Sequence, residues 1–268
     1  MRKVFETDNI TLYHGDVTDI SDVSFTSLVT SPPYAEQRKK FYNGVSEDKY
    51  PAWTTDWMSK VKPLISDTGS CLINIRENIS KGEISDYVLR TRLAVRESGW
   101  KECEELIWIK PDGPPVGNIN RPRRSWERIL WFSNTGKPNA YPKANGTFSK
   151  NISFRKQDVG QSLKQWGSGF TDDKEPQAGF TRCKDYVEIS VSNNAKKEHS
   201  HPAAYPVPLA EWMLKLVSVE GDTILDPFSG SGTTGIAAVN NGRKYIGIDN
   251  SLEYLDMTIE RYKKIGLI

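Results

Sequence analysis

A glycine-rich segment near the carboxyl end lies between an apolar run that predicts a strand over residues 223–228 and a pattern that predicts a helix over residues 233–240. Its glycines, Gly230, Gly232 and Gly235, follow the spacing G-x-G-x-x-G. This spacing permits a tight strand-to-helix turn and lets a ligand approach the free amides at the helix start. The segment therefore predicts an α/β fold with a ligand at the end of a parallel strand.

Strands and helices alternate along most of the chain. Short apolar runs predict strands, and longer periodic segments predict helices. The expected strands cover residues 10–14, 25–30, 71–75, 105–109, 128–132, 223–228 and 245–249, and the expected helices cover 51–65, 84–97, 208–219, 233–240 and 251–264. This alternation predicts an open, mostly parallel α/β sheet with helices on both faces.

The segment 135–198 has a different texture from the rest of the chain. Gly, Pro, Asn, Ser, Lys and Gln are common there, and apolar periodicity is weak. Its aromatic residues favour an ordered lobe over a disordered linker; they include Trp166, Phe170, Phe180 and Tyr186. We therefore expect a small lobe, residues 135–198, inserted between two halves of one domain, residues 1–134 and 199–268.

Acidic residues around the glycines indicate the kind of ligand. Asp249 ends the next expected strand, about 20 positions on, where its carboxylate can accept both hydroxyls of a ribose. Asp226 ends the preceding strand and is placed to meet the amino end of an amino-acid-bearing nucleoside. Thr233 stands where a phosphate-binding P-loop would have lysine, which excludes that motif. A nicotinamide enzyme stays open on this half alone.

Two motifs together resemble one enzyme family. The first is Ser31-Pro32-Pro33-Tyr34, and the second is Asp226-Pro227-Phe228-Ser229-Gly230-Ser231-Gly232-Thr233-Thr234-Gly235. The first resembles the amino-group pocket of DNA methyltransferases that modify exocyclic nitrogens, and the second resembles the S-adenosylmethionine loop of the same enzymes. Because the catalytic motif precedes the cofactor motif, the chain is similar to the β-group of these amino-methyltransferases.

The resemblance implies a Rossmann-like methyltransferase sheet, S-adenosylmethionine as cofactor and double-stranded DNA as substrate. Residues 1–134 would form the catalytic half, 135–198 a target-recognition lobe and 199–268 the cofactor-binding half. Asp16 would approach the adenine amino group, and His201 and Pro202 would line the methionine side. The implied cofactor-binding residues are Asp16, His201, Pro202, Asp226, Pro227, Phe228, Gly230, Ser231, Gly232, Thr233, Thr234 and Asp249.

The residue types of the first motif suit transfer to an exocyclic nitrogen, whose lone pair is delocalised into the base. Acceptors that hold its N–H bonds out of plane localise the lone pair, and Ser31 Oγ and the Pro32 carbonyl are suitable acceptors. Pro33 stiffens the turn, and Tyr34 offers a face for the base. Flipping the base costs a few kcal/mol, and stacking on an aromatic returns ~1–3 kcal/mol.

Serine at the first motif position, preceded by Thr30, is typical of cytosine-N4 enzymes, whereas many adenine-N6 relatives carry Asp or Asn. The extension 35–40 strengthens the similarity to type II N4-cytosine enzymes. Some adenine enzymes also carry Ser, so adenine N6 remains the close alternative. Cytosine-C5 chemistry is not expected, because that family attacks with a Pro-Cys cysteine and no Pro-Cys occurs here.

The formal charge is only +2, so a DNA surface must be a local basic patch. We expect phosphate contacts from two clusters, which are Arg38, Lys39 and Lys40, and Arg121, Arg123 and Arg124. Two other classes of protein would each explain only some of these sequence features. A non-catalytic DNA-binding protein leaves the cofactor loop unexplained, and a nicotinamide-dependent oxidoreductase leaves Ser31–Tyr34 unexplained.

Three scattered cysteines and three histidines predict neither a disulfide framework nor a metal site. No apolar run approaches membrane length, and the first residues lack the apolar region of a secretory signal. We therefore expect a cytoplasmic protein of a bacterial or phage modification system, with no membrane partner. A cognate restriction endonuclease would be a natural partner, and the sequence does not indicate an oligomeric state.

Overall fold

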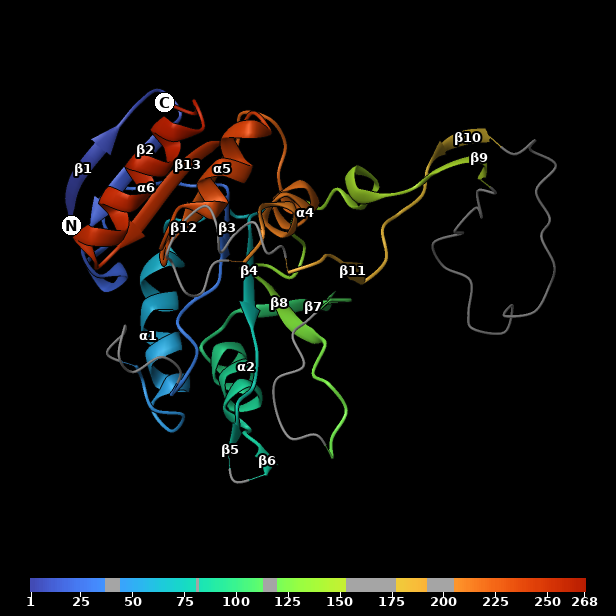
Figure 1. Cartoon of the computed structure of the whole chain (residues 1–268), viewed down its shortest axis with the longest axis horizontal. Helices are drawn as coiled ribbons and strands as arrows, with labels where there is room; N and C mark the ends of the chain where they lie inside the picture. Colours follow the sequence, from blue (N-terminus) through green and yellow to red (C-terminus); the bar gives the residue numbers. More distant parts are fainter. Residues whose placement is uncertain (37–43, 81, 113–119, 153–176, 192–204) are drawn as a thin grey trace.

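The computed structural model describes residues 1–36, 44–80, 82–112, 120–152, 177–191 and 205–268. A nine-stranded sheet runs through it (Figure 1). In spatial order the strands are β1 (Arg2–Glu6), β2 (Ile10–His14), β13 (Lys244–Asp249), β12 (Thr223–Asp226), β3 (Ser27–Thr30), β4 (Ser70–Ile75), β8 (Trp126–Ser133), β7 (Lys101–Ile109) and β11 (Tyr186–Glu188). The run from β2 to β4 is parallel, and so is the pair β7–β11. β1 is antiparallel to β2, and β8 is antiparallel to both of its neighbours.

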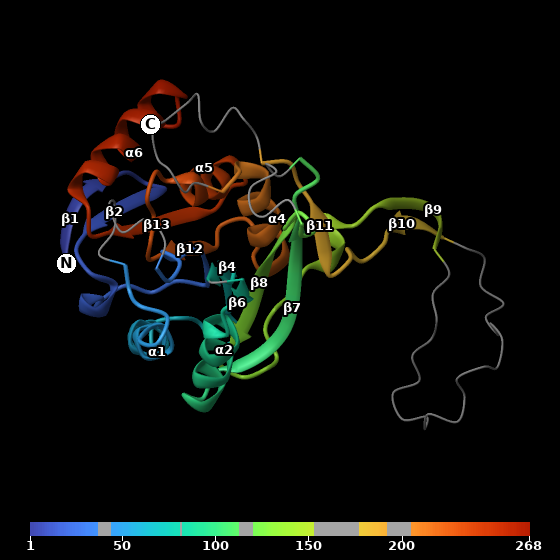
Figure 2. The same cartoon turned by 60° about the horizontal axis from the view of Figure 1, so that its bottom comes forward.

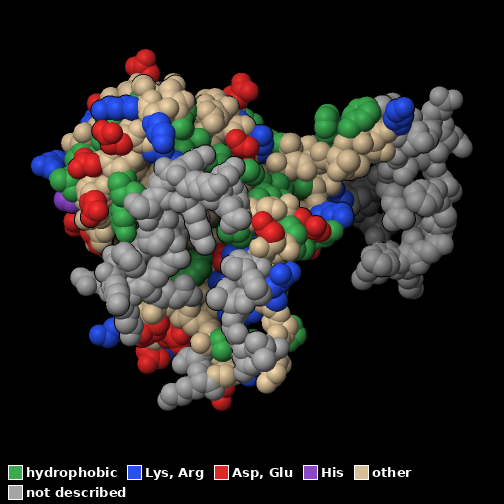
Figure 3. Space-filling view, in the orientation of Figure 1, with side chains coloured by type: hydrophobic (Ala, Val, Ile, Leu, Met, Phe, Trp, Pro, Cys, Tyr) green, Lys and Arg blue, Asp and Glu red, His purple; other side chains and the backbone are tan. Residues whose placement is uncertain are grey.

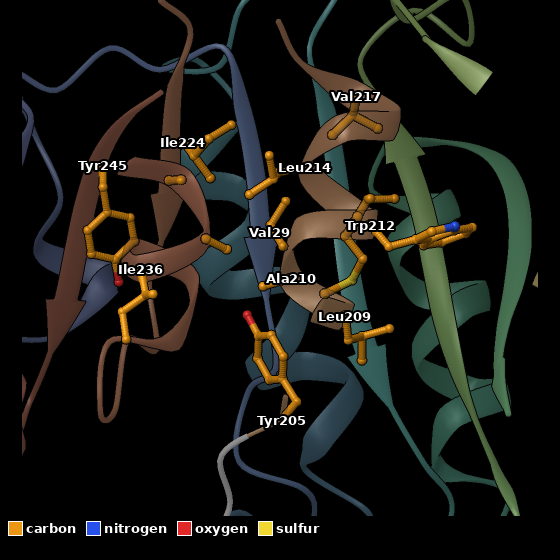
Figure 4. Close-up of a cluster of buried hydrophobic side chains, with 14 of the residues drawn as sticks. Val29, Tyr205, Leu209, Ala210, Trp212, Leu214, Val217, Ile224, Ile236 and Tyr245 are labelled. Atoms are coloured by element: carbon orange, nitrogen blue, oxygen red, sulfur yellow. The ribbon is translucent and has the colours of Figure 1, made fainter. Parts of the chain in front are cut away.

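Helices cover both faces of the sheet, as the alternating pattern predicted. α1 (Tyr50–Val61) and α2 (Tyr87–Glu97) pack on one face, and α4 (Val207–Val217), α5 (Thr233–Asn240) and α6 (Leu252–Lys264) pack on the other. Successive strand residues serve opposite faces. On β3, Leu28 joins the α1–α2 core and Val29 joins the α4–α6 core. Figure 4 shows Ala210 and Leu214 of α4 beside Val29.

The mostly parallel α/β fold is therefore confirmed, with differences at the edges. The edge strand β1 was not expected, because Arg2, Lys3 and Glu6 are exposed and the segment shows no apolar alternation. The structure also has two short strands, β5 (Ile79–Ser80) and β6 (Glu83–Ile84), and two 3-10 turns, η1 (Val17–Asp19) and η2 (Pro142–Asn145). None of the described helices is long and apolar enough to cross a membrane.

Within the expected inserted lobe, residues 135–198, the described strands fall into two groups. β9 (Phe148–Ile152) and β10 (Gln177–Phe180) form a separate antiparallel pair that lies away from the main sheet (Figures 1 and 2). β11, within the same range, instead extends the main sheet beside β7. Trp166 and Phe170, two aromatic residues on which the lobe was predicted, lie outside the described residues.

The order in which the chain adds strands to the sheet reverses between β12 and β3, which are neighbouring parallel strands. From β12 the chain passes through α5 to β13 on one side, and from β3 it passes through α1 to β4 on the other. In open α/β sheets such a switch point leaves a crevice at the carboxyl ends of the strands, where ligands bind. Both sequence motifs lie at this place.

Candidate active site

The two motifs follow neighbouring strands. Ser31–Tyr34 begins directly after β3, and the glycine-rich segment begins at the last residue of β12. The strands pair in parallel, with Ile224 opposite Ser27 and Leu225 opposite Leu28. Parallel strands end at the same sheet edge, so segments nearly 200 positions apart meet there.

Asp226 joins the two motifs and is only 2% exposed. Its carboxylate accepts hydrogen bonds from Thr30 Oγ1 (2.6 Å), the Phe228 amide (3.1 Å) and the Thr234 hydroxyl. The Thr234 hydroxyl also bonds the Tyr205 phenol. Burial raises the pKa of Asp226 to about 6, against the lowering effect of these hydrogen bonds. Through these three hydrogen bonds, Asp226 stabilises the conformation of the loop from inside the protein.

The glycine loop is oriented by α6, which the sequence did not indicate. Side chains of α6 donate to three successive loop carbonyls. The bonds run from Thr258 to Gly230 O (2.9 Å), from Arg261 to Ser231 O (3.0 Å) and from Tyr262 to Gly232 O (2.7 Å). In a trans peptide the carbonyl and the following amide point in opposite directions. The amides of Ser231 and Thr233 consequently point away from α6, as a ligand at the start of α5 requires.

Two of the glycines are required by packing. Gly232 has φ +73°, and a Cβ there would lie 2.5 Å from Thr258 Cγ2. A Cβ on Gly235 would overlap the Tyr262 hydroxyl and lie 2.7 Å from the Tyr245 ring. Gly235 therefore allows α5 to pack closely against β13 and α6, which is the role of the third glycine in this spacing.

Asp249 and Asp16 follow the two strands beyond β12. Asp249 ends β13 and is 9% exposed, and its oxygens accept the amides of Gly230 (2.7 Å) and Ser251 (2.9 Å). Burial raises its pKa. A carboxylate offers about four lone-pair sites, so acceptor capacity remains for a ligand. Asp16 lies just beyond β2 and is exposed, and its Oδ1 accepts the amide of Thr18 (2.9 Å).

These donors and acceptors suit an adenosine that bears an amino acid. Acidic side chains stand at the carboxyl ends of three adjacent parallel strands, and no described residue accepts from the amides of Ser231 and Thr233 in the loop. Phe228 completes one wall, with its ring centroid 5.4 Å from that of Trp53 and 5.3 Å from that of Trp57. His201 and Pro202 lie outside the described residues.

The segment Ser31–Tyr34 contains the carbonyl of Pro32, to which no described residue donates. The Tyr50 hydroxyl at the start of α1 donates to Pro33 O (2.9 Å), which fixes the turn. The Pro32 carbonyl is thus available as an acceptor.

Tyr34 is held by its hydroxyl rather than only by its ring. The hydroxyl donates to Glu127 Oε2 (2.8 Å) and lies 3.2 Å from Asn74 Oδ1 and 3.5 Å from Ser31 Oγ. Burial raises the pKa of Tyr34 well above its ordinary value, and the Glu127 carboxylate raises it further. The phenol therefore remains protonated and is a hydrogen-bond donor.

A family model described as DNA methylase matches residues 26–260. The chain belongs to the DNA methylase family. The Type II methyltransferase M.ScaI of Streptomyces caespitosus is 29% identical over 266 residues, which cover 96% of this chain and 82% of that one.

Two solved structures show the same fold as this methylase. The PvuII DNA methyltransferase, described as cytosine-N4-specific, matches with a TM-score of 0.72 and 23% identity, covering 96% of this chain and 87% of that one. The M1.HpyAVI–SAM complex matches with a TM-score of 0.61 and 20% identity, covering 94% and 98%.

The basic residues that were expected to contact DNA differ in their exposure and in their ion pairing. Arg121 and Arg123 are exposed beside the strand β8, whereas Arg124 pairs with Glu77 (3.3 Å) and donates to its carbonyl (2.7 Å). The cluster 38–40 lies outside the described residues. Over the α5–α6 part of the face shown in Figure 3, charges of both signs are interspersed.

Sequence reasoning missed a charged cluster behind Tyr34. Glu127 at the start of β8 is 6% exposed; it forms an ion pair with Lys110 and lies 3.9 Å from Arg76. Lys110 follows β7, Glu127 lies near the start of β8 and Arg76 follows β4. The sheet therefore brings the three side chains to one edge. The available signal was a pair of charged residues, Lys110 and Glu127, at the ends of two expected strands.

Proposed function

We propose that this DNA methylase transfers a methyl group to the exocyclic N4 of a flipped cytosine in a specific double-stranded DNA sequence. The observation that supports this most strongly is the union of Ser31–Tyr34 with the glycine loop at one switch point. The motif supplies acceptors for an amino group, and the loop supplies a nucleoside site.

S-adenosylmethionine is the cofactor of this family, and solved neighbours include complexes with it. When bound, it supplies a methyl group already activated on a sulfonium. The residues that would hold it are the amides of Ser231 and Thr233, the carboxylates of Asp249 and Asp16, and the wall at Phe228. Asp226 would act chiefly by shaping the loop, because its oxygens already accept three hydrogen bonds within the protein.

Ser31 Oγ and Pro32 O would accept the two N–H bonds of the target amino group. This arrangement localises the nitrogen lone pair toward the methyl donor, and Tyr34 supplies a stacking face worth ~1–3 kcal/mol. The remaining task is alignment, since a well-oriented pair of reactants avoids most of the entropic cost of meeting. No covalent enzyme intermediate is required.

Ser31 is the basis for proposing cytosine. A hydroxyl both donates and accepts, so it can address the cytosine N3 together with the amino group. Adenine N6 remains the alternative, because the same acceptors fit its amino group.

We assign DNA contacts to Arg121 and Arg123, which are exposed, and to residues 38–40. Arg124 would contact DNA only by leaving Glu77, so we expect it to contribute less. M.ScaI is a Type II methyltransferase, and we propose that this chain likewise serves a restriction-modification system with a cognate endonuclease.

Product analysis tests the choice of base. The protein is incubated with heterologous genomic DNA and S-adenosylmethionine, and the DNA is digested to nucleosides for chromatography with mass spectrometry. We expect N4-methylcytosine. N6-methyladenine would overturn the assignment to cytosine and leave the site intact, whereas cofactor binding without any methylated nucleoside would count against DNA as the substrate.

A further inference from the structure

We infer that Glu127 is a positioning residue for methyl transfer, and that it acts through the phenol of Tyr34. The inference rests on the proposed function, in which Tyr34 stacks on the flipped base. It adds a residue from a distant strand to the motif Ser31–Tyr34.

The contacts place Glu127 where it can orient Tyr34. Its Oε2 accepts the Tyr34 hydroxyl at 2.8 Å, and its Oε1 faces Lys110 and Arg76. Because the two oxygens have different partners, the carboxylate cannot rotate freely. The ring of Tyr34 is then fixed at its hydroxyl end by β8 and at its backbone end by the turn after β3.

The charges of the cluster allow a carboxylate to remain at this position. A buried carboxylate needs a partner cation, and the Glu127 side chain is 8% exposed while that of Lys110 is 11% exposed. Burial lowers the pKa of Lys110, and the Glu127 carboxylate opposes that change. Lys110 also lies over the Trp108 ring at 4.2 Å, so its position is fixed as well.

A phenol bonded to a carboxylate has an electron-rich ring, which suits the charge that develops in the reaction. The carbon–nitrogen bond forms as the carbon–sulfur bond breaks, and the electron pair of the broken bond goes to sulfur. Positive charge therefore passes to the base, whose amino group then releases a proton to solvent. A cation over an aromatic face is attracted to it, so Glu127 would favour the transition state more than the bound substrate.

A double-mutant cycle distinguishes this role from simple support of the fold. The variants are Tyr34→Phe, Glu127→Gln and the pair, and the measurement is the single-turnover rate of methyl transfer to genomic DNA. We expect each single change to lower the rate about tenfold or more. The pair should be no slower than Tyr34→Phe alone, because Glu127 acts through the hydroxyl that Phe lacks. Multiplicative losses would overturn the inference.

Glu102→Gln is the matched control, since Glu102 lies on β7 of the same sheet and its side chain, 12% exposed, pairs with Arg92 of α2 at 2.8 Å. It should leave the rate unchanged, and equal losses in Glu102→Gln and Glu127→Gln would contradict a specific role. A readout without turnover is the ¹³C signal of the Tyr34 Cζ, assigned by its loss in Tyr34→Phe. This signal should shift in Glu127→Gln and not in Glu102→Gln.

If Glu127→Gln does not fold, Tyr34→Phe alone tests the claim, because a wild-type rate without the hydroxyl would refute it. Failure of the proposed function is separate, since it would appear as an absence of methylated nucleoside with the unaltered protein.

Discussion

Thr30 Oγ1 donates a 2.6 Å hydrogen bond to Asp226 Oδ1, across a sequence separation of 196 positions. Thr30 directly precedes the catalytic motif, and Asp226 begins the cofactor loop. Both residues are almost fully buried. A movement of either motif must therefore disturb the other, which ties the proposed acceptors for the base to the proposed site of the methyl donor.

The raised pKa of Asp226 predicts a pH-dependent stability. Its folded pKa of about 6 exceeds the unfolded value of ~3.9, so the folded state binds the extra proton between these pH values. The stability that this group contributes is fully present below pH ~4 and is lost as the pH rises through about 6, amounting to about 3 kcal/mol. The variant Asp226→Asn has no carboxyl group at this position, so its stability does not fall with pH for this reason. Urea unfolding from pH 4 to 7.5 should show the variant gaining on the parent as the pH rises, and parallel profiles would refute the assignment.

Gly235→Ala should destabilise the fold by about 1–3 kcal/mol, a typical cost of overpacking. The added methyl group would meet the Tyr262 hydroxyl and the Tyr245 ring. Tyr262→Phe removes the nearest atom and should partly restore the stability of Gly235→Ala, although it also removes the bond to Gly232 O. Thermal and urea unfolding measure both effects, and a strictly additive loss in the double variant would argue against this contact.

Tyr50→Phe should slow turnover while changing stability by only about 1 kcal/mol, the usual worth of one hydrogen bond. It frees Pro33 O and loosens the turn that orients Pro32 O and Ser31. We expect the loss in kcat rather than in cofactor affinity. Tyr186→Phe, on the edge strand β11, is the control. An unchanged kcat in Tyr50→Phe would show that the turn does not need this bond.

Asp249→Ala should weaken binding of S-adenosylmethionine at least about tenfold, or 1.4 kcal/mol. Calorimetry gives the Kd directly. The variant also leaves the amides of Gly230 and Ser251 without their acceptor, so we expect a stability loss of about 1–3 kcal/mol. Asp256→Ala, on the exposed side of α6, serves as the control. An unaltered Kd would remove Asp249 from the cofactor site.

The sequence was most informative where local pattern and chemistry agree. β12, α5 and β13 were predicted nearly to the residue, because apolar strands flank a glycine spacing with one structural meaning. The parallel arrangement followed from the alternation of strands and helices, and the family followed from the resemblance of this loop together with Ser31–Tyr34. The antiparallel β8 could not be predicted, since strand direction depends on pairing partners rather than on composition.

The missed parts of the site depend on tertiary contacts. In the sequence, the segment that forms α6 has only the pattern of an ordinary amphipathic helix. The hydrogen bonds from Thr258, Arg261 and Tyr262 to the loop become visible only when α6 is packed against it. Glu127 and Lys110 lie 17 positions apart and meet because β7 and β8 are antiparallel. Asp226 was predicted to meet the ligand, and its contacts inside the protein emerge only from the pairing of β12 with β3.

A comparison of Tyr34→Ala with the unaltered protein in two assays separates methyl transfer from cofactor binding. Methyl transfer to genomic DNA reports on the catalytic motif, and calorimetry with S-adenosylmethionine reports on the glycine loop. We expect a strong loss of transfer with a nearly unchanged cofactor Kd. An unaltered rate of transfer would contradict the assignment of Ser31–Tyr34 as the site where the base is methylated.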